Sequence, residues 1–272
     1  MTVSRLLCAL FLLAASAAHA GLDVTEALTR YQTMTGVSVT GLDADQLRDL
    51  LAGETVYRTV KLSDEQDRSN TIIRIVGYRL INEPREPLWL AALAYDGNFS
   101  TRLTEYLASS DEQGDAVWYQ HVDMPWPLRD RHWLIRTSKN RKLAEATGNE
   151  IWEHHWGLAD DSYARIADIA RRNVVDNLSR EDFRRAVILP RNNGAWVMTK
   201  VSENQTLVVL HATMDMGGMV PDGLVARSTR KQLRKMLTKI EADSDTAYAN
   251  YDRRYAIYRG DGSLIESRQQ GE

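Results

Sequence analysis

The chain has 272 residues, of which 43% are hydrophobic, and carries a formal net charge of −3 at pH 7. A slight acidic excess does not suggest a nucleic-acid-binding protein. Cys8 is the only cysteine. Disulfides, thiolate catalysis and cysteine-bound zinc are therefore excluded for the remainder of the chain.

Residues 1–20 are predicted to be a cleaved signal peptide. Arg5 provides a basic start, residues 6–18 form an apolar run, and Ala18-His19-Ala20 fits a small-x-small cleavage site. No later apolar stretch is long enough to cross a bilayer. An exported chain without further cysteine suits a Gram-negative periplasm, so we expect a soluble, monomeric periplasmic protein.

Residues 21–54 are predicted to form an N-terminal helical segment before the main domain, residues 55–258. Two stretches in this segment begin with an aspartate that can cap a helix, Asp23 and Asp43, and Gly53 ends the second helix.

Alternation of apolar and polar residues predicts a sheet in the first half of the main domain. The strands expected on this basis cover residues 55–62, 70–80, 99–108 and 116–123. Pro84 and Pro87 end the second strand, and residues 88–95 have the apolar spacing of a short helix. Because turns rather than helical crossovers join the strands, the sheet should be antiparallel.

A proline-rich connection, residues 124–130, follows these strands. Prolines on both sides of Trp126 cannot lie in a central strand, so this segment is predicted to be a rigid link. The elements expected after it are strands at 131–143, 149–157, 183–189, 194–201 and 206–215, and a helix at 160–178.

The last predicted element is a long helix that runs from the Gly217-Gly218 turn to about Tyr258. Apolar residues recur along it at helical spacing, so one of its faces must be buried. One long helix across a curved antiparallel sheet buries that face economically, which predicts an α+β protein. Residues 259–272 are expected to form a flexible tail.

Three motifs occur in a fixed order along the chain. A short helix follows the first hairpin, the proline-rich connection leads through Asp130-Arg131 into an aromatic strand, and the last strand leads into Gly217-Gly218 and the long helix. In this combination residues 42–257 resemble the START domains (steroidogenic-acute-regulatory-protein-related lipid transfer) of the SRPBCC group. The resemblance implies the helix-grip fold and a carrier that binds a lipid or another apolar ligand, without a cofactor, in a tunnel between the sheet and the C-terminal helix.

Arg136 lies where several family members place a cavity-facing arginine, so the resemblance implies that it binds the polar end of a ligand. If Arg136 faces inward, strand alternation brings His132 and Leu134 in with it. The alternative is an arginine that pairs on the sheet surface. The other residues expected to line the tunnel are Trp152, His154, Trp196, Met198, Met214, Met219, Val220 and Leu224.

The histidines do not predict a metal site. His154 and His155 are adjacent on a strand and point to opposite faces, while His121, His132 and His211 lie on separate strands. No nucleophile elbow and no phosphate-binding loop is present, and no catalytic residue is predicted.

Three functions therefore stay open. The first is a lipid carrier. The second is a cyclase-like or aromatase-like enzyme that uses His132 and Arg136, and the third is a non-catalytic interaction module whose cavity is filled by side chains. The six basic residues between Arg227 and Lys239 could meet anionic lipid headgroups at a membrane surface, or they form an ordinary solvated helix face.

Overall fold

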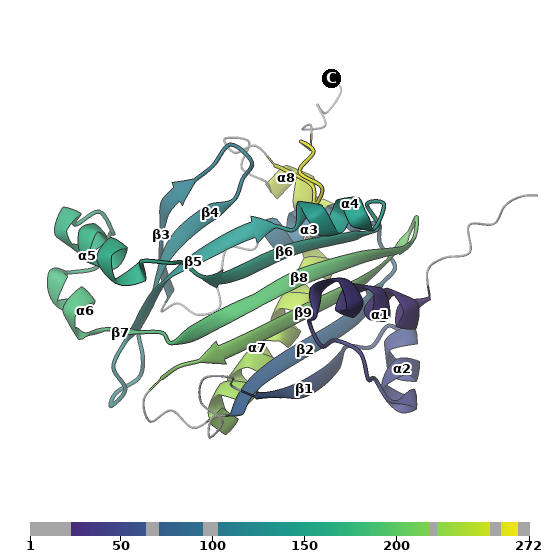
Figure 1. The fold of residues 1–272 in the computed structure, drawn as a ribbon, viewed down its shortest axis with the longest axis horizontal. Helices are drawn as coiled ribbons and strands as arrows, with labels where there is room; N and C mark the ends of the chain where they lie inside the picture. Colours follow the sequence, from purple (N-terminus) through teal and green to yellow (C-terminus); the bar gives the residue numbers. More distant parts are fainter. Residues whose placement is uncertain (1–22, 64–70, 95–102, 218–221, 251–256, 266–272) are drawn as a thin grey trace, which may run out of the picture.

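A curved sheet separates the helices of this α+β protein into two sets, as Figure 1 shows for the computed structural model. The structure describes residues 23–63, 71–94, 103–217, 222–250 and 257–265. The predicted signal peptide lies outside these residues. Among the described residues, no helix combines the length and the apolar character needed to span a membrane.

The described part of the chain forms one nine-stranded sheet in the order β1-β2-β9-β8-β6-β5-β4-β3, with β7 paired to β5. The strands are β1 Val56–Ser63, β2 Thr71–Ile81, β3 Leu103–Ser110, β4 Ala116–Val122, β5 Arg131–Lys139, β6 Ile151–Leu158, β7 Val187–Ile188, β8 Arg191–Ser202 and β9 Gln205–Asp215. Only the two-residue pairing of β5 with β7 is parallel among these described strands. The predicted antiparallel sheet is confirmed.

The helices connect and cover these strands. They are α1 Val24–Thr35, α2 Ala44–Leu51, α3 Arg85–Leu93, α4 Arg141–Ala146, α5 Ser162–Arg172, α6 Arg180–Arg185, α7 Asp222–Asp243 and α8 Ala247–Asn250, with a 3-10 turn at Ser244–Thr246. Asp23 and Asp43 cap α1 and α2 as predicted, each through its carboxylate and backbone N–H groups of the first turn.

Three predicted boundaries are wrong, each because of a local cap. The strand expected at 131–143 ends at Lys139, since the side chain of Asn140 accepts a hydrogen bond from the Leu143 N–H and begins α4. The helix expected at 160–178 stops at Asn173, which adopts a left-handed conformation. Ser179 then caps α6 in a capping box, so the first part of the strand expected at 183–189 is helical and only Val187–Ile188 is strand.

The core is divided between the two faces of the sheet. One face of the sheet is covered by α7, and we call it the α7 face. There the sheet and α7 share a cluster that includes Ile75, Trp152, Trp196, Met198, Leu210, Leu233, Met236, Leu237 and Ile240. On the outer face, Val76, Tyr78, Val197 and Val209 share a second cluster with α1 and α2. The N-terminal helices predicted as a separate segment therefore belong to the same packed domain as the sheet.

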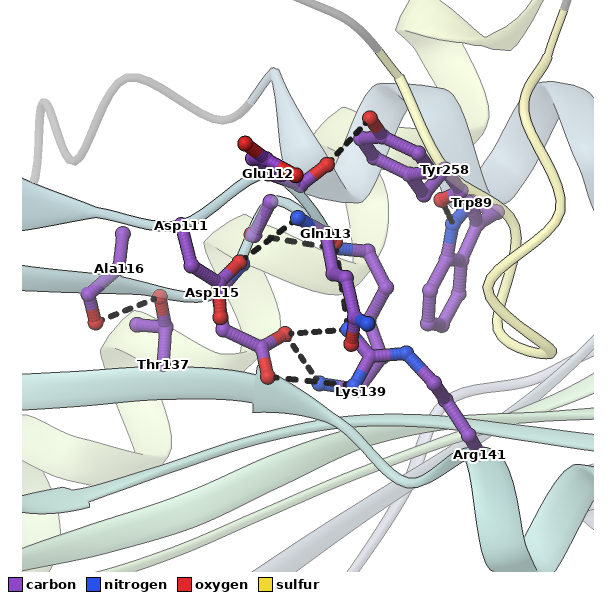
Figure 2. A network of polar contacts seen from close by, with 11 residues as sticks. Trp89, Asp111, Glu112, Gln113, Asp115, Ala116, Thr137, Lys139, Arg141 and Tyr258 are labelled. Atoms are coloured by element: carbon purple, nitrogen blue, oxygen red, sulfur yellow. Dashed lines mark hydrogen bonds and ion pairs between the residues drawn. The ribbon is translucent and has the colours of Figure 1, made fainter.

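The C-terminal segment packs against the β3–β4 turn and α3, as Figure 2 shows. The Tyr258 hydroxyl donates to the carbonyl of Glu112 over 2.5 Å, and Trp89 Nε1 donates to the carbonyl of Tyr258 over 3.0 Å. Ile265 is buried in the cluster on the α7 face. The expectation of a flexible tail from residue 259 is wrong as far as residue 265, and the remaining tail residues lie outside the described part.

Candidate functional site

Arg136 does not face α7, which corrects the prediction made for it. Its side chain is exposed, and it lies on the same side of β5 as Leu134, which packs beneath α5 and α6 on the outer face. His132 is also on the outer face. It is buried against Tyr119 and Phe183, where it lines an open cleft of about 660 Å³ beside α5 and α6. None of these three residues is placed to line a tunnel between the sheet and α7.

The other side of β5 supplies the residues that do face α7. Trp133 and Ile135 alternate with the three residues above, and they cluster with side chains from neighbouring strands. Together these form what we call the aromatic surface, which consists of Trp118, Trp133, Ile135, Trp156, Leu158, Met214 and Met216. Trp133 and Ile135 are buried, whereas the other five members are only partly buried.

Several predicted lining residues do lie on the α7 face. Met214 belongs to the aromatic surface, and Trp152, Trp196 and Met198 are buried in the neighbouring cluster. His154 lies edge-on to Trp89, with ring centroids 6.2 Å apart. His155 points to the opposite face, as predicted from strand alternation. Met219 and Val220 lie outside the described residues, and Leu224 is in the first turn of α7 with a side chain that is also outside them.

The indole of Trp156 is held flat against the sheet by two neighbours on β8. Its Nε1 donates to Oδ1 of Asn192 over 3.1 Å. A Cβ added to Gly194 would lie 2.4 Å from the six-membered ring of Trp156, so only glycine leaves room for the indole there. Trp156 is thereby presented as a fixed, partly uncovered plane of the aromatic surface.

Trp133 carries an unused hydrogen-bond donor. Its Nε1 is buried and has no partner among the described residues. A buried indole N–H normally finds an acceptor, because leaving it unpaired costs free energy.

Arg131 was not among the predicted site residues, yet it holds the segment that leads into α7. Its Nε donates to the carbonyl of Met216 over 2.6 Å, and its Nη2 donates to the carbonyl of Gly217 over 3.1 Å. Burial lowers the pKa of the guanidinium, which nevertheless stays protonated at neutral pH. Its place in the Asp130-Arg131 pair of the proline-rich motif was the available sequence signal.

The charged side chains on this side of the sheet, among them Arg131, Lys139 and Arg85, are bonded to or stacked on other protein groups. Burial, followed by the nearby positive charge of Lys139, lowers the pKa of His154 to about 3, so its imidazole is neutral at pH 7. Arg85 at the far end of the face stacks on Trp152, with its guanidinium carbon 3.6 Å from the ring centroid. The aromatic surface itself is therefore suited to an uncharged, mostly apolar partner.

The middle of the α7 face is filled by side chains. A Cβ at Gly77 would lie 2.9 Å from Cδ1 of Leu237, so the C-terminal half of α7 approaches β2 as closely as the backbone permits. Leu237 and Ile240 are fully buried there. Side chains therefore fill this part of the α7 face.

Solved structures confirm the fold. Human StAR-related lipid transfer protein 5 matches with a TM-score of 0.50 at 8% identity, over 82% of this chain and 95% of that chain. Human STARD10 matches with a TM-score of 0.48 at 14% identity, over 77% of this chain and 82% of that chain. A STAR-related lipid transfer protein from Xanthomonas axonopodis matches with a TM-score of 0.47 at 12% identity, over 75% of this chain and 97% of that chain. No protein-family model matches the sequence, and no curated protein matches it significantly.

These identities are too low to transfer a function, and they concern the fold. The chain has the START-type, helix-grip fold, with a long C-terminal helix on a curved antiparallel sheet.

Proposed function

We propose that this protein binds a lipid or another apolar ligand on its aromatic surface and carries the ligand without transforming it. The observation that supports the proposal is the combination of partly uncovered apolar side chains with the unpaired donor of Trp133. Apolar surface is favourably removed from water by an apolar partner, at roughly 25 cal/mol for each Å² buried. A preformed apolar site with few polar groups is typical of small-molecule binding.

The ligand is expected to have one oxygen acceptor within an otherwise apolar body. Trp133 Nε1 would donate to that oxygen, and Trp156 would stack on the apolar part. The exposed position of Arg136 removes the charged donor predicted from the sequence, so a hydroxyl, carbonyl or ester fits this surface better than a free phosphate or carboxylate. Burying an unpaired anion beside indole rings would be costly.

Ligand exchange would take place at the start of α7. The aromatic surface includes Met216, whose carbonyl is held by Arg131. Gly217 follows with a φ of +66°, in the left-handed region. Loss of the Arg131 bond next to this glycine would let the junction open for exchange.

A filled interior favours the second candidate, an interaction module without a ligand. The close packing of Leu237 on Gly77 shows that side chains fill part of the α7 face. The cyclase-like alternative loses its proposed pair, because His132 and Arg136 both lie on the outer face.

Extraction of the purified protein with organic solvent, followed by mass spectrometry, tests the proposal. A carrier should release an apolar compound in near-stoichiometric amount, and it should take up the same compound after delipidation. A Trp156→Ala variant should lose most of this uptake, whereas Tyr163→Ala, on the exposed surface of α5, should keep it. Folded protein that neither releases nor takes up any apolar compound would favour the interaction module.

Export to the periplasm and transient contact with membranes belong to the same proposal. The basic residues of α7 and the exposed Trp126 are the surface features that support membrane contact. Fractionation of the native host, with sequencing of the mature N-terminus near Gly21, tests the location. A protein that starts at Met1 and stays in the cytoplasm would contradict it.

A further inference from the structure

Three side chains around the proline-rich connection converge on one point. His121 lies near the end of β4, Asp123 directly precedes the connection, and Asp130 ends it. One ligand atom from each lies within 4.8 Å of those of the other two. His121 is fully buried, whereas Asp123 is exposed and Asp130 partly so, and the point is therefore reachable from solvent.

The imidazole of His121 has a nitrogen that nothing in the described structure satisfies. Nε2 is buried without a hydrogen-bond partner, 3.5 Å from Oδ1 of Asp123 and 3.8 Å from Oδ2 of Asp130. Both distances exceed the 2.7–3.2 Å typical of an N–H···O hydrogen bond. A buried nitrogen that faces two carboxylates at these distances calls for an explanation, and a cation held between them supplies one.

The spacing fits a metal ion. Tetrahedral coordination with metal–ligand distances of about 2.1 Å puts ligand atoms about 3.4 Å apart. The nitrogen-to-oxygen distances in the structure are 3.5 and 3.8 Å. Small side-chain rotations are therefore enough to close the site on an ion.

Two of the three side chains, Asp130 and His121, are already oriented by hydrogen bonds through the atom that does not face this point. Oδ1 of Asp130 accepts from the Met124 N–H over 2.8 Å, which leaves Oδ2 for the ion. Nδ1 of His121 lies 3.3 Å from the Tyr119 hydroxyl, which lies 3.2 Å from Nδ1 of His132. When Tyr119 donates to His132 and accepts from the Nδ1–H of His121, the lone pair of His121 Nε2 points at the carboxylates. Such outer partners are typical of metal-binding histidines.

We infer that His121, Asp123 and Asp130 form a binding site for a divalent transition-metal ion of the zinc class. One imidazole nitrogen and two carboxylate oxygens suit Zn²⁺, Co²⁺ or Mn²⁺, whereas Ca²⁺ and Mg²⁺ prefer ligand sets made only of oxygen. Three protein ligands leave at least one position for water. The ion would fasten both ends of the proline-rich connection next to Arg131, and it is independent of the proposed lipid ligand.

The site was not predicted from the sequence, because the histidines of the chain lie on different strands and show no metal-ligand spacing. His121 and His132 are directly opposite in the β4–β5 register, with ring centroids 6.2 Å apart. That pairing supplies the Tyr119 bridge. The two aspartates lie at opposite ends of the turn around the prolines and come together only when that turn forms.

Calorimetric titration of EDTA-treated protein with Zn²⁺ tests the inference. Wild type should bind one equivalent, and Ca²⁺ should not compete. Asp123→Asn, which changes an exposed side chain, should weaken binding by roughly tenfold or more, equivalent to about 1.4 kcal/mol. The matched control, Asp176→Asn in the exposed connection between α5 and α6, should bind as wild type does.

Co²⁺ gives a second measurement that reports the ligands directly. Its visible absorption should rise on addition to wild type with the intensity of a four- or five-coordinate site, and it should be absent in Asp123→Asn and Asp130→Asn. Saturating Zn²⁺ should also raise the Tm of wild type and not that of Asp123→Asn. No binding by wild type, or equal binding by wild type and Asp123→Asn, would overturn the inference.

Discussion

Arg131 Nε donates to the carbonyl oxygen of Met216 over 2.6 Å, which joins the start of β5 to the segment that leads into α7. The two residues are far apart in the sequence and belong to two of the three motifs on which the START resemblance rested. A single guanidinium therefore links the proline-rich connection to the long helix. Three donated bonds, to Met216, Gly217 and Arg129, use most of its donors.

Arg131→Met should destabilise the protein by about 2 kcal/mol or more, because it removes bonds to a charged group and leaves buried carbonyls unpaired. Arg136→Met is the matched control on the same strand. Its exposed side chain should change the free energy of unfolding by no more than about 0.5 kcal/mol. Urea unfolding measures both. Similar losses for the two variants would show that the Arg131 bonds do not hold the α7 junction.

Trp133→Phe should reduce affinity selectively for ligands that carry an oxygen acceptor. The expected loss is about 1 kcal/mol, the contribution of one hydrogen bond, while a hydrocarbon of equal length should bind nearly as well as to wild type. Trp118→Phe, on the same surface, should affect both ligands equally. Competition with a fluorescent lipid measures the two affinities, and equal losses in Trp133→Phe would show that its N–H does not meet the ligand.

His211 should make the protein less stable at mildly acidic pH. It is buried on the outer face, where its Nε2 lies 3.1 Å from the hydroxyl of Tyr31, which itself donates to Glu153. Burial, and then the charge of Arg74, lowers the pKa of His211 to about 3. The unfolded chain, with a histidine pKa near 6.5, therefore binds a proton that the folded chain excludes.

Because the folded chain excludes this proton, the free energy of unfolding falls as the pH is lowered. The contribution of neutral, buried His211 to the stability of the fold is fully present above about pH 6.5. It declines as the pH falls from there toward 3. Between pH 7 and pH 5.5 it should amount to about 1 kcal/mol. His211→Gln should lower stability at pH 7 but show a smaller further loss at pH 5.5. Identical pH profiles for wild type and the variant would contradict the assignment.

Trp126 should contribute to binding at membrane surfaces. It is 92% exposed at the tip of the proline-rich connection, and indole rings favour the interface between lipid and water. Trp126→Ala should weaken binding to vesicles that contain anionic phospholipid several-fold. Tyr163→Ala, whose aromatic side chain is also exposed, is the control. Vesicle sedimentation measures both, and equal binding by all three proteins would remove Trp126 from the membrane contact.

Strand alternation predicted much of the fold. It was less successful in predicting which face of the sheet a given side chain points to. Trp152, Trp196 and Met198, which were expected to line the tunnel, lie on the α7 face in its buried core cluster. On β5 the two faces were assigned from the expected inward direction of Arg136. Because side chains alternate, an error at this one residue reverses the face of all the others on the strand. The more apolar set, Trp133 and Ile135, was the better guide.

Other features depended on contacts between distant residues. The convergence of His121, Asp123 and Asp130 needs the β4–β5 register and the path of the connection. The break between α5 and α6 depends on a left-handed Asn173, which the apolar spacing does not reveal. Neither is encoded by local periodicity.

The pairing of β2 with β9 has a kinetic consequence. Arg74 and Thr213, which are opposite each other in this pair, are separated by 139 positions in the chain. A pair of interior strands so far apart in the chain makes folding slow, because the intervening chain loses entropy before the contacts stabilise it. Until β9 has been synthesised, β2 has no partner on that side and the sheet remains in two pieces. Under the proposed export to the periplasm, this delay would keep the polypeptide unfolded until it has crossed the membrane.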